Sequence, residues 1–101
     1  MAHERKIYAS SPSEFAKLFG LNLAQARRRV GLSQEELGFR ASLHRTAVGQ
    51  MERGERGPRL DSAVRLAGTL ELPIDTLLEG ITWKLPEFAA GGFLYSARKG
   101  A

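Results

Sequence analysis

Apolar side chains recur every three or four residues near the beginning of the chain, which is the spacing of one face of an α-helix. The residues of this apolar face are Phe15, Phe19, Leu23, Ala26 and Val30. Ser11 is placed to cap the helix, with Pro12 as its first residue and Glu14 as the acidic partner in a capping box. Gly31 ends the pattern, so the sequence predicts a first helix over about 13–30.

A second capping box at residues 33–36 begins a short helix. Its apolar residues are Leu37 and Ala41, which would be buried, and Phe39, which would pack at its flank. This helix is expected to end near Ser42, and a third helix runs from about 44 to 53, where Gly54 stops it. Two short helices are thus joined by a turn of about three residues.

Two more helices follow a loop at 57–58. The apolar positions of the fourth helix are Leu60, Val64, Ala67 and Leu70. Residues 73–78, with Gly80 behind them, predict a fifth and shorter helix. The pattern predicts no strand before residue 80.

The chain changes character after residue 80. Residues 81–85 alternate apolar and polar side chains as a half-buried strand does, Pro86 interrupts them, and 89–92 can turn the chain before 93–95. The large apolar side chains of this tail are Trp83, Leu85, Phe88, Phe93 and Tyr95. Because they would expose too much apolar surface to water, we expect the tail either to close over its own core or to pair with another subunit.

The two short helices describe a helix-turn-helix, in which Gly38 would let them cross closely. In the second of these helices only three residues can face a core, namely Ala47, Val48 and Met51. Its outward polar side chains are Arg45, Thr46 and Gln50. Side chains of these types can present donors and acceptors to base edges in a major groove, so we expect double-stranded DNA as the partner.

The positive charge of the chain is concentrated around these helices. The formal net charge is +4, and residues 27–59 alone hold eight arginines against four glutamates. The planar donor array of arginine suits phosphates and base edges better than the point charge of lysine does. A solvated basic face would carry the same charge, so the charge supports nucleic-acid binding without deciding it.

Composition excludes several other classes of protein. With 101 residues, 43% of them hydrophobic and 26% charged, the chain is expected to be a single cytoplasmic globular domain with no membrane span. It has no cysteine, no histidine cluster and no glycine-rich phosphate loop, so we expect no metal, no cofactor and no enzymatic activity. Glu35 and Glu36 are adjacent, and on a helix they point about 100° apart, which does not suit a paired acid and base.

Three motifs together carry a resemblance to a known family. They are GLSQEEL at 31–37, MERG at 51–54 and LPIDTLL at 72–78. The chain over about 15–79 resembles the Xre-type, Cro/CI-like helix-turn-helix domain of phage and bacterial repressors.

This resemblance implies the fold class and the organisation of the chain. The fold would be all-α, with five helices forming a lambda-repressor-like DNA-binding domain over 11–80. Outside the span of the resemblance, the residue pattern predicts a flexible N-terminus over 1–10 and an extended tail over 81–101, able to form β-structure, that docks on the core or dimerises. The tail residues expected in that packing are Trp83, Leu85, Phe93 and Tyr95.

The resemblance also implies roles for individual residues. The positions that match base-reading residues are Arg45, Thr46, Ala47 and Gln50. The positions that match phosphate-contacting residues are Gln34, His44, Arg53 and Arg56. Glu52 matches a residue that forms an internal salt bridge, here to Arg40 or to an arginine of the first helix. The run Arg27 to Arg29 is expected chiefly to balance the helix dipole and to face water, although one of these arginines could reach a phosphate.

Three residues depart from the family pattern. Ser42 stands where the turn usually has glycine, so it either accepts a left-handed conformation or the turn differs slightly. His44 replaces the common serine or threonine cap. Gly49 lies inside the third helix, where it costs about 1 kcal/mol relative to alanine and would allow the backbone to approach a phosphate closely.

We therefore expect a transcriptional regulator, a repressor, that binds a near-palindromic operator as a homodimer and reads it with helix 44–53. The alternative is an antitoxin or regulatory subunit whose main partner is another protein, docked through residues 81–95. Order in this tail that requires a different protein would favour the alternative, and pairing of the tail with its twin would favour the homodimer.

Overall fold

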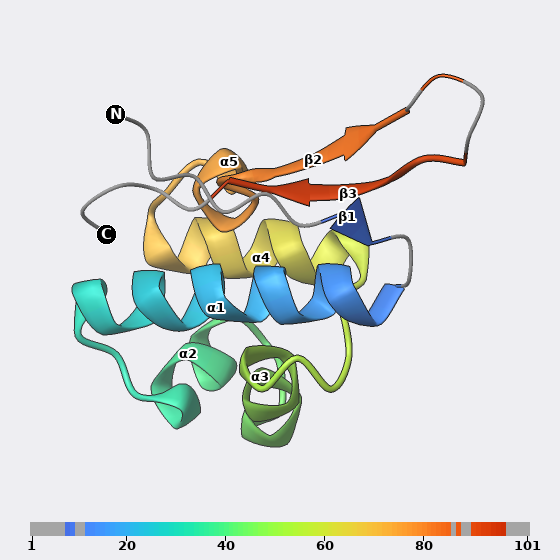
Figure 1. Ribbon diagram of the computed structural model, residues 1–101. Helices are drawn as coiled ribbons and strands as arrows, with labels where there is room; N and C mark the ends of the chain where they lie inside the picture. Colours follow the sequence, from blue (N-terminus) through green and yellow to red (C-terminus); the bar gives the residue numbers. More distant parts are fainter. Residues whose placement is uncertain (1–7, 10–11, 86, 88–89, 97–101) are drawn as a thin grey trace.

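The computed structural model describes residues 8–9, 12–85, 87 and 90–96. Within these residues the chain forms five helices and three short strands (Figure 1). They are β1 (Tyr8–Ala9), α1 (Pro12–Val30), α2 (Gln34–Arg40), α3 (Arg45–Glu52), α4 (Leu60–Leu70), α5 (Ile74–Leu77), β2 (Ile81–Lys84) and β3 (Gly92–Tyr95). The predicted all-α domain of five helices is confirmed. No helix in the described part of the chain is both long and apolar enough to cross a membrane.

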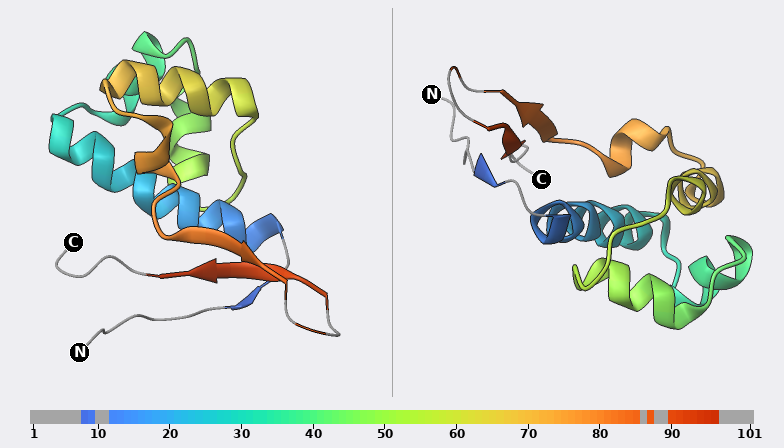
Figure 2. Two further views of the ribbon diagram at one scale, coloured as in Figure 1. Left: turned by 90° about the horizontal axis from the view of Figure 1, so that it is seen from above. Right: turned by 90° about the vertical axis from the view of Figure 1, so that its right-hand side faces the viewer.

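Helix α1 occupies the centre of the structure. It lies between the sheet on one side and α2 and α3 on the other, with α4 beside it (Figures 1 and 2). Phe19, Leu23 and Ala26 of α1 are buried in a core to which all five helices contribute. The other buried residues of this core are Leu37, Ala41, Val48, Met51, Ala63, Leu66, Ala67, Leu70 and Leu77.

Four apolar residues expected in or beside the core are exposed instead. They are Val30, Phe39, Leu60 and Val64, with exposed fractions of 45%, 84%, 79% and 57%. Val30 and Leu60 are terminal residues of α1 and α4. Helix α4 turns Ala63 and Leu66 inward, so Val64 faces water, and Phe39 lies about 200° around α2 from the buried Leu37. Periodicity allowed more than one phase for these helices, and packing selected one.

Two glycines allow helices to approach α3 closely. A Cβ atom on Gly38 would lie 2.7 Å from the carbonyl oxygen of Leu43, which confirms the close contact expected at that position. A Cβ atom on Gly20 in α1 would meet the carbonyl oxygen of Met51 and would lie 2.8 Å from that of Glu52. Sequence reasoning missed Gly20, because its neighbours are distant in the chain.

The turn between α2 and α3 contains a strained residue. Ser42 has a φ of 59°, so it accepts the left-handed conformation that glycine usually takes there. The amide of Leu43 donates to the carbonyl of Gly38 at 2.7 Å, and Arg65 of α4 donates to the carbonyl of Ser42 at 3.2 Å. These bonds hold the turn in spite of the strain.

The tail forms an antiparallel sheet with the strand order β1-β3-β2. Trp83 pairs with Phe93, and their ring centroids are 5.0 Å apart. Phe93 in turn contacts Phe15 of α1, with a centroid distance of 5.3 Å. The tail thus packs on α1 of its own chain, yet Trp83 and Leu85 stay 54% and 76% exposed.

The prediction of no strand before residue 80 is wrong, because Tyr8 and Ala9 pair with Leu94 and Phe93 of β3. A two-residue strand has no recognisable local pattern and exists only through its distant partner. The remaining residues of the expected flexible N-terminus lie outside the described residues, as do Ser11, Pro86, Phe88 and Ala89.

A buried asparagine connects α1 to the beginning of the tail. Asn22 is 8% exposed, and its amide nitrogen donates to the carbonyls of Leu77 at 3.0 Å and Glu79 at 2.9 Å. It thereby satisfies carbonyl groups at the end of α5. Gly80 follows with a φ of 81° and directs the chain into β2.

Replacing Gly20 with alanine is expected to lower the free energy of unfolding by about 2 kcal/mol, because the added methyl group has no space against the backbone of α3. Gly68→Ala is the matched control. Gly68 also lies within a helix, but nothing is within 4 Å of its added Cβ, so this change should raise stability by up to about 1 kcal/mol. Urea denaturation of both variants tests this, and equal effects would contradict the close approach of α1 and α3.

Candidate nucleic-acid interface

The start of α2 is fixed by the capping box that the sequence predicted. The hydroxyl of Ser33 accepts a hydrogen bond from the amide of Glu36 at 3.0 Å, and the amide of Ser33 donates to the carboxylate of Glu36 at 2.8 Å. The hydrogen bond from the Ser33 backbone amide to this carboxylate, with a smaller contribution from the Ser33 side chain, lowers the pKa of Glu36. The first turn of α2, which begins at Gln34, is therefore held in one conformation.

The start of α3 is capped by a histidine. Nδ1 of His44 accepts a hydrogen bond from the amide of Thr46 at 3.0 Å, so the imidazole replaces the usual hydroxyl cap. His44 is exposed. The expected cap is thus present, and it orients the first turn of α3, which carries Arg45 and Thr46.

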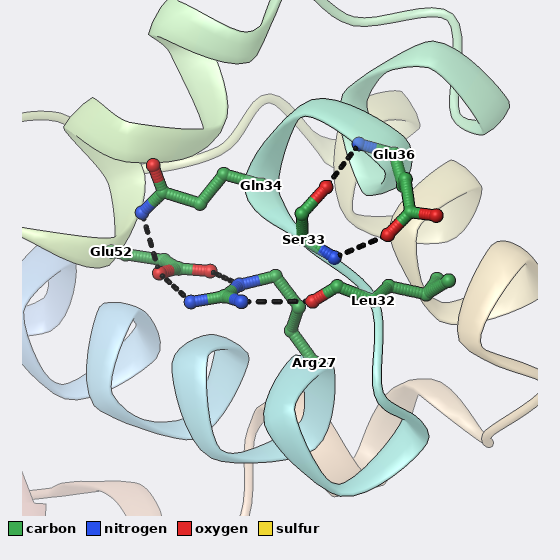
Figure 3. A network of polar contacts seen from close by, with 6 residues as sticks. All are labelled: Arg27, Leu32, Ser33, Gln34, Glu36 and Glu52. Carbon is green, nitrogen blue, oxygen red and sulfur yellow. Dashed lines mark hydrogen bonds and ion pairs between the residues drawn. The ribbon is translucent and has the colours of Figure 1, made fainter.

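A buried ion pair between Arg27 and Glu52, with Gln34 bound to it, connects α1, α2 and α3 (Figure 3). Arg27 of α1 donates to both carboxylate oxygens of Glu52, from Nε at 2.6 Å and from Nη2 at 3.0 Å. Gln34 of α2 donates to the same carboxylate at 2.9 Å, and Arg27 also donates to the carbonyl of Leu32 at 2.9 Å. The side chains of Arg27 and Glu52 are only 12% and 5% exposed, and the hydrogen bond to Glu52 raises the pKa of Arg27. The network fixes α3 relative to α1 and α2.

This network decides two expectations. Glu52 forms the predicted internal salt bridge, and its partner is an arginine of the first helix rather than Arg40. The expectation that Arg27 faces water is wrong, because its guanidinium group is buried against the carboxylate of Glu52. Charge runs are usually solvated, and no local feature of the sequence marks one of three consecutive arginines as buried.

Gly49 provides space beside the same network. It is buried, and a Cβ atom on it would lie 3.0 Å from Nη1 of Arg53 and 3.4 Å from Oε1 of Gln34. The missing side chain therefore lets the side chains of Gln34 and Arg53 lie across α3. A methyl group at this position would require these flexible side chains to shift by a few tenths of an ångström, and the expected close approach of the backbone to a phosphate stays a prediction.

A hollow with a volume of about 530 Å³ lies between the start of α2 and α3. Four of the predicted DNA contacts line it, namely Gln34, Arg45, Thr46 and Arg53. The other four predicted contacts do not line this hollow. Gln50 is half-buried on α3 and accepts from Arg56 at 3.4 Å, and Ala47 packs partly against the core. His44 lies at the first turn of α3.

The arginines of this surface are held by weak, exposed ion pairs. Arg45 pairs with Glu35 at 3.3 Å, and their side chains are 65% and 73% exposed. Arg53 pairs with Glu55 at 2.7 Å, and this contact raises the pKa of Arg53 and lowers that of Glu55. Exposed pairs of this kind contribute little to stability, so an incoming anion can replace the carboxylates.

Comparison with known proteins places the chain in a family. The helix-turn-helix family matches residues 23–77, more than half of the chain. The chain belongs to this family. It is a helix-turn-helix protein of the Xre, Cro/CI-like type, which confirms the resemblance seen in its motifs, and the family is one of DNA-binding transcriptional regulators.

Individual relatives agree with this assignment. The chain is 36% identical over 66 residues to control protein C.BamHI of Bacillus amyloliquefaciens, covering 64% of this chain and 82% of that protein. The crystal structure of the restriction-modification controller protein C.AhdI from Aeromonas hydrophila is similar with a TM-score of 0.63 and 37% identity, over 64% of this chain and 94% of that chain. The P22 c2 repressor, solved in complex with a synthetic operator, is similar with a TM-score of 0.57 and 27% identity, over 61% and 94% of the two chains.

Replacing Glu52 with glutamine is expected to lower the free energy of unfolding by about 3 kcal/mol, because it leaves the buried Arg27 without its counter-charge. Glu35→Gln is the matched control, since it removes the exposed partner of Arg45 and should cost less than about 1 kcal/mol. Chemical denaturation measures both values. Similar losses of stability in the two variants would show that the Arg27–Glu52 pair does not hold the helices together.

Proposed function

We propose that this protein is a sequence-specific transcriptional regulator that binds operator DNA as a homodimer and acts as a repressor. The observation that carries the proposal is the polar face of α3, which stands beside a hollow lined by arginine and glutamine side chains in a helix-turn-helix domain. Such a helix fits the major groove of double-stranded DNA, and its polar side chains match the donors and acceptors of base edges.

Base reading is assigned to the exposed side of α3. Arg45 and Thr46 lie in its first turn, and Gln50 lies about one turn further along. Arginine pairs well with guanine and glutamine with adenine, and the methyl group of Ala47 can contact a thymine methyl group. Arg45 would exchange Glu35 for a base edge on binding.

Phosphate contacts are assigned to side chains around the rim of this surface. Gln34 and Arg53 line the hollow, Arg56 lies after α3, and His44 lies at its start. Gln34 already donates one hydrogen bond to Glu52, and the second hydrogen of its amide group remains for a phosphate. These contacts would supply affinity for all sequences alike.

The homodimer is supported by the exposed apolar residues of the tail. The β2–β3 hairpin lies on the side of α1 opposite to α3 (Figures 1 and 2). We propose that Trp83 and Leu85 contact the second copy, while Phe93 and Tyr95 of β3 face α1 and anchor the hairpin to it. A dimer would place two α3 helices in successive major grooves about 34 Å apart.

Selection of bound duplexes from random DNA at near-physiological salt tests the proposed function. We expect enrichment of an inverted repeat whose half-sites are about one helical turn apart. A lone half-site would keep DNA binding but exclude the homodimer. Folded protein that enriches no sequence would contradict the proposal and favour the role in which the tail docks another protein.

Substitutions on the selected site then test the division of roles. Gln50→Ala should reduce the preference for the selected site over random DNA by about tenfold, because it removes a base contact. Arg53→Ala should weaken binding to both kinds of DNA by similar factors, because it removes a phosphate contact. Titrations on the two duplexes measure these ratios, and the same ratio for both variants would contradict the assignment.

A further inference from the structure

A second hollow continues from the one beside α3. Its volume is about 390 Å³, and its walls come from α1, α3 and the end of β3. Gln25 and Arg28 of α1 line it, and Tyr95 closes it on the side of the tail. Gln34 and Arg53 line both hollows, so the two hollows adjoin at these side chains.

The charge of this second hollow is positive. No carboxylate among the described residues lies within ion-pairing distance of Arg28. The carboxylate of Glu52 also borders the hollow, but both of its oxygens accept hydrogen bonds from Arg27. The negative charge on the wall of the hollow is thus already neutralised, and an anion would meet the guanidinium group of Arg28 without competition.

The donors of the hollow suit a phosphodiester. The guanidinium of Arg28 and the amide of Gln25 lie one turn apart on α1 and can both donate to phosphate oxygens. The DNA backbone is the anion that would already be present at Gln34 and Arg53. Because Gln34 and Arg53 line the second hollow together with Arg28, a strand held at these two residues would pass beside Arg28.

We propose that the second hollow binds one more backbone phosphate of the same DNA, outside the base pairs read by α3, with Arg28 as its main ligand. This inference rests on the proposed function, since it extends the DNA contact onto α1 and the C-terminal sheet. The tail then takes part in DNA binding by shaping the hollow through Tyr95, in addition to its proposed role in the dimer.

Binding of Arg28→Ala and Arg29→Ala to the selected duplex tests the proposal. Arg29 is the matched control, because it is exposed on the same turn of α1 and lines neither hollow. We expect Arg28→Ala to bind about tenfold more weakly. Its plot of log K against log salt should be less steep by about 0.9, which is the slope that one phosphate contributes. Arg29→Ala should bind within about twofold of the unsubstituted protein.

A scan with single neutral methylphosphonate linkages locates the phosphate. One linkage outside the half-site should weaken binding of the unsubstituted protein and of Arg29→Ala, and should have no further effect on Arg28→Ala. Equal weakening of DNA binding by Arg28→Ala and Arg29→Ala would indicate a general charge effect and would overturn the proposal. The proposal would also be overturned if every linkage that weakens binding of the unsubstituted protein weakened binding of Arg28→Ala as well. Thermal unfolding of both variants serves as the check that they fold.

The failure of this inference differs from the failure of the proposed function. If the unsubstituted protein binds no DNA, the proposed function is wrong and the inference falls with it. If the unsubstituted protein binds its selected site and Arg28→Ala binds equally well, the inference alone is wrong.

Discussion

The orientation of α3 depends on one buried carboxylate. Glu52 of α3 accepts hydrogen bonds from Arg27 of α1 and Gln34 of α2, so its two carboxylate oxygens connect three helices. A buried charge is costly unless it is paired and hydrogen-bonded, so any rotation or sliding of α3 that breaks these contacts is penalised. Apolar packing of Val48 and Met51 drives α3 onto the core, and the polar network selects one of the positions that packing allows. The proposed base-reading face is thereby aimed before DNA arrives.

The arginines of the basic region at residues 27–59 have different physical roles. Arg27 is buried and pairs with Glu52. Arg45 and Arg53 are exposed, and they pair with carboxylates that an anion can replace. This difference follows from burial, because a pair in water costs little to exchange and a pair in the interior costs much. One sequence region thus both holds the proposed reading helix and supplies its contacts.

Helix α1 connects the proposed DNA surface to the tail. Its Gly20 lies against the end of α3, its Asn22 caps the end of α5, and its Phe15 contacts β3. A helix that packs on three sides cannot move without disturbing all of them. The C-terminal sheet, which lies outside the family domain, is therefore packed against a helix of that domain. Through Tyr95 it also lines the hollow on the exposed side of α1 that carries Arg28.

Local information in the chain was sufficient to predict five helices, both caps of the helix-turn-helix, the close contact at Gly38 and the family. These features depend on spacing, capping chemistry and motifs, which neighbouring residues carry. Tertiary packing alone established that Arg27 is the partner of Glu52, that Gly20 must be small, and that Tyr8 and Ala9 join the sheet. Each of these depends on residues far apart in the chain, and a single sequence contains no local signal for which distant groups will meet. The grouping of Gln34 and Arg53 with Arg28 around one hollow is of the same kind, because burial and charge neutralisation exist only once the helices are packed.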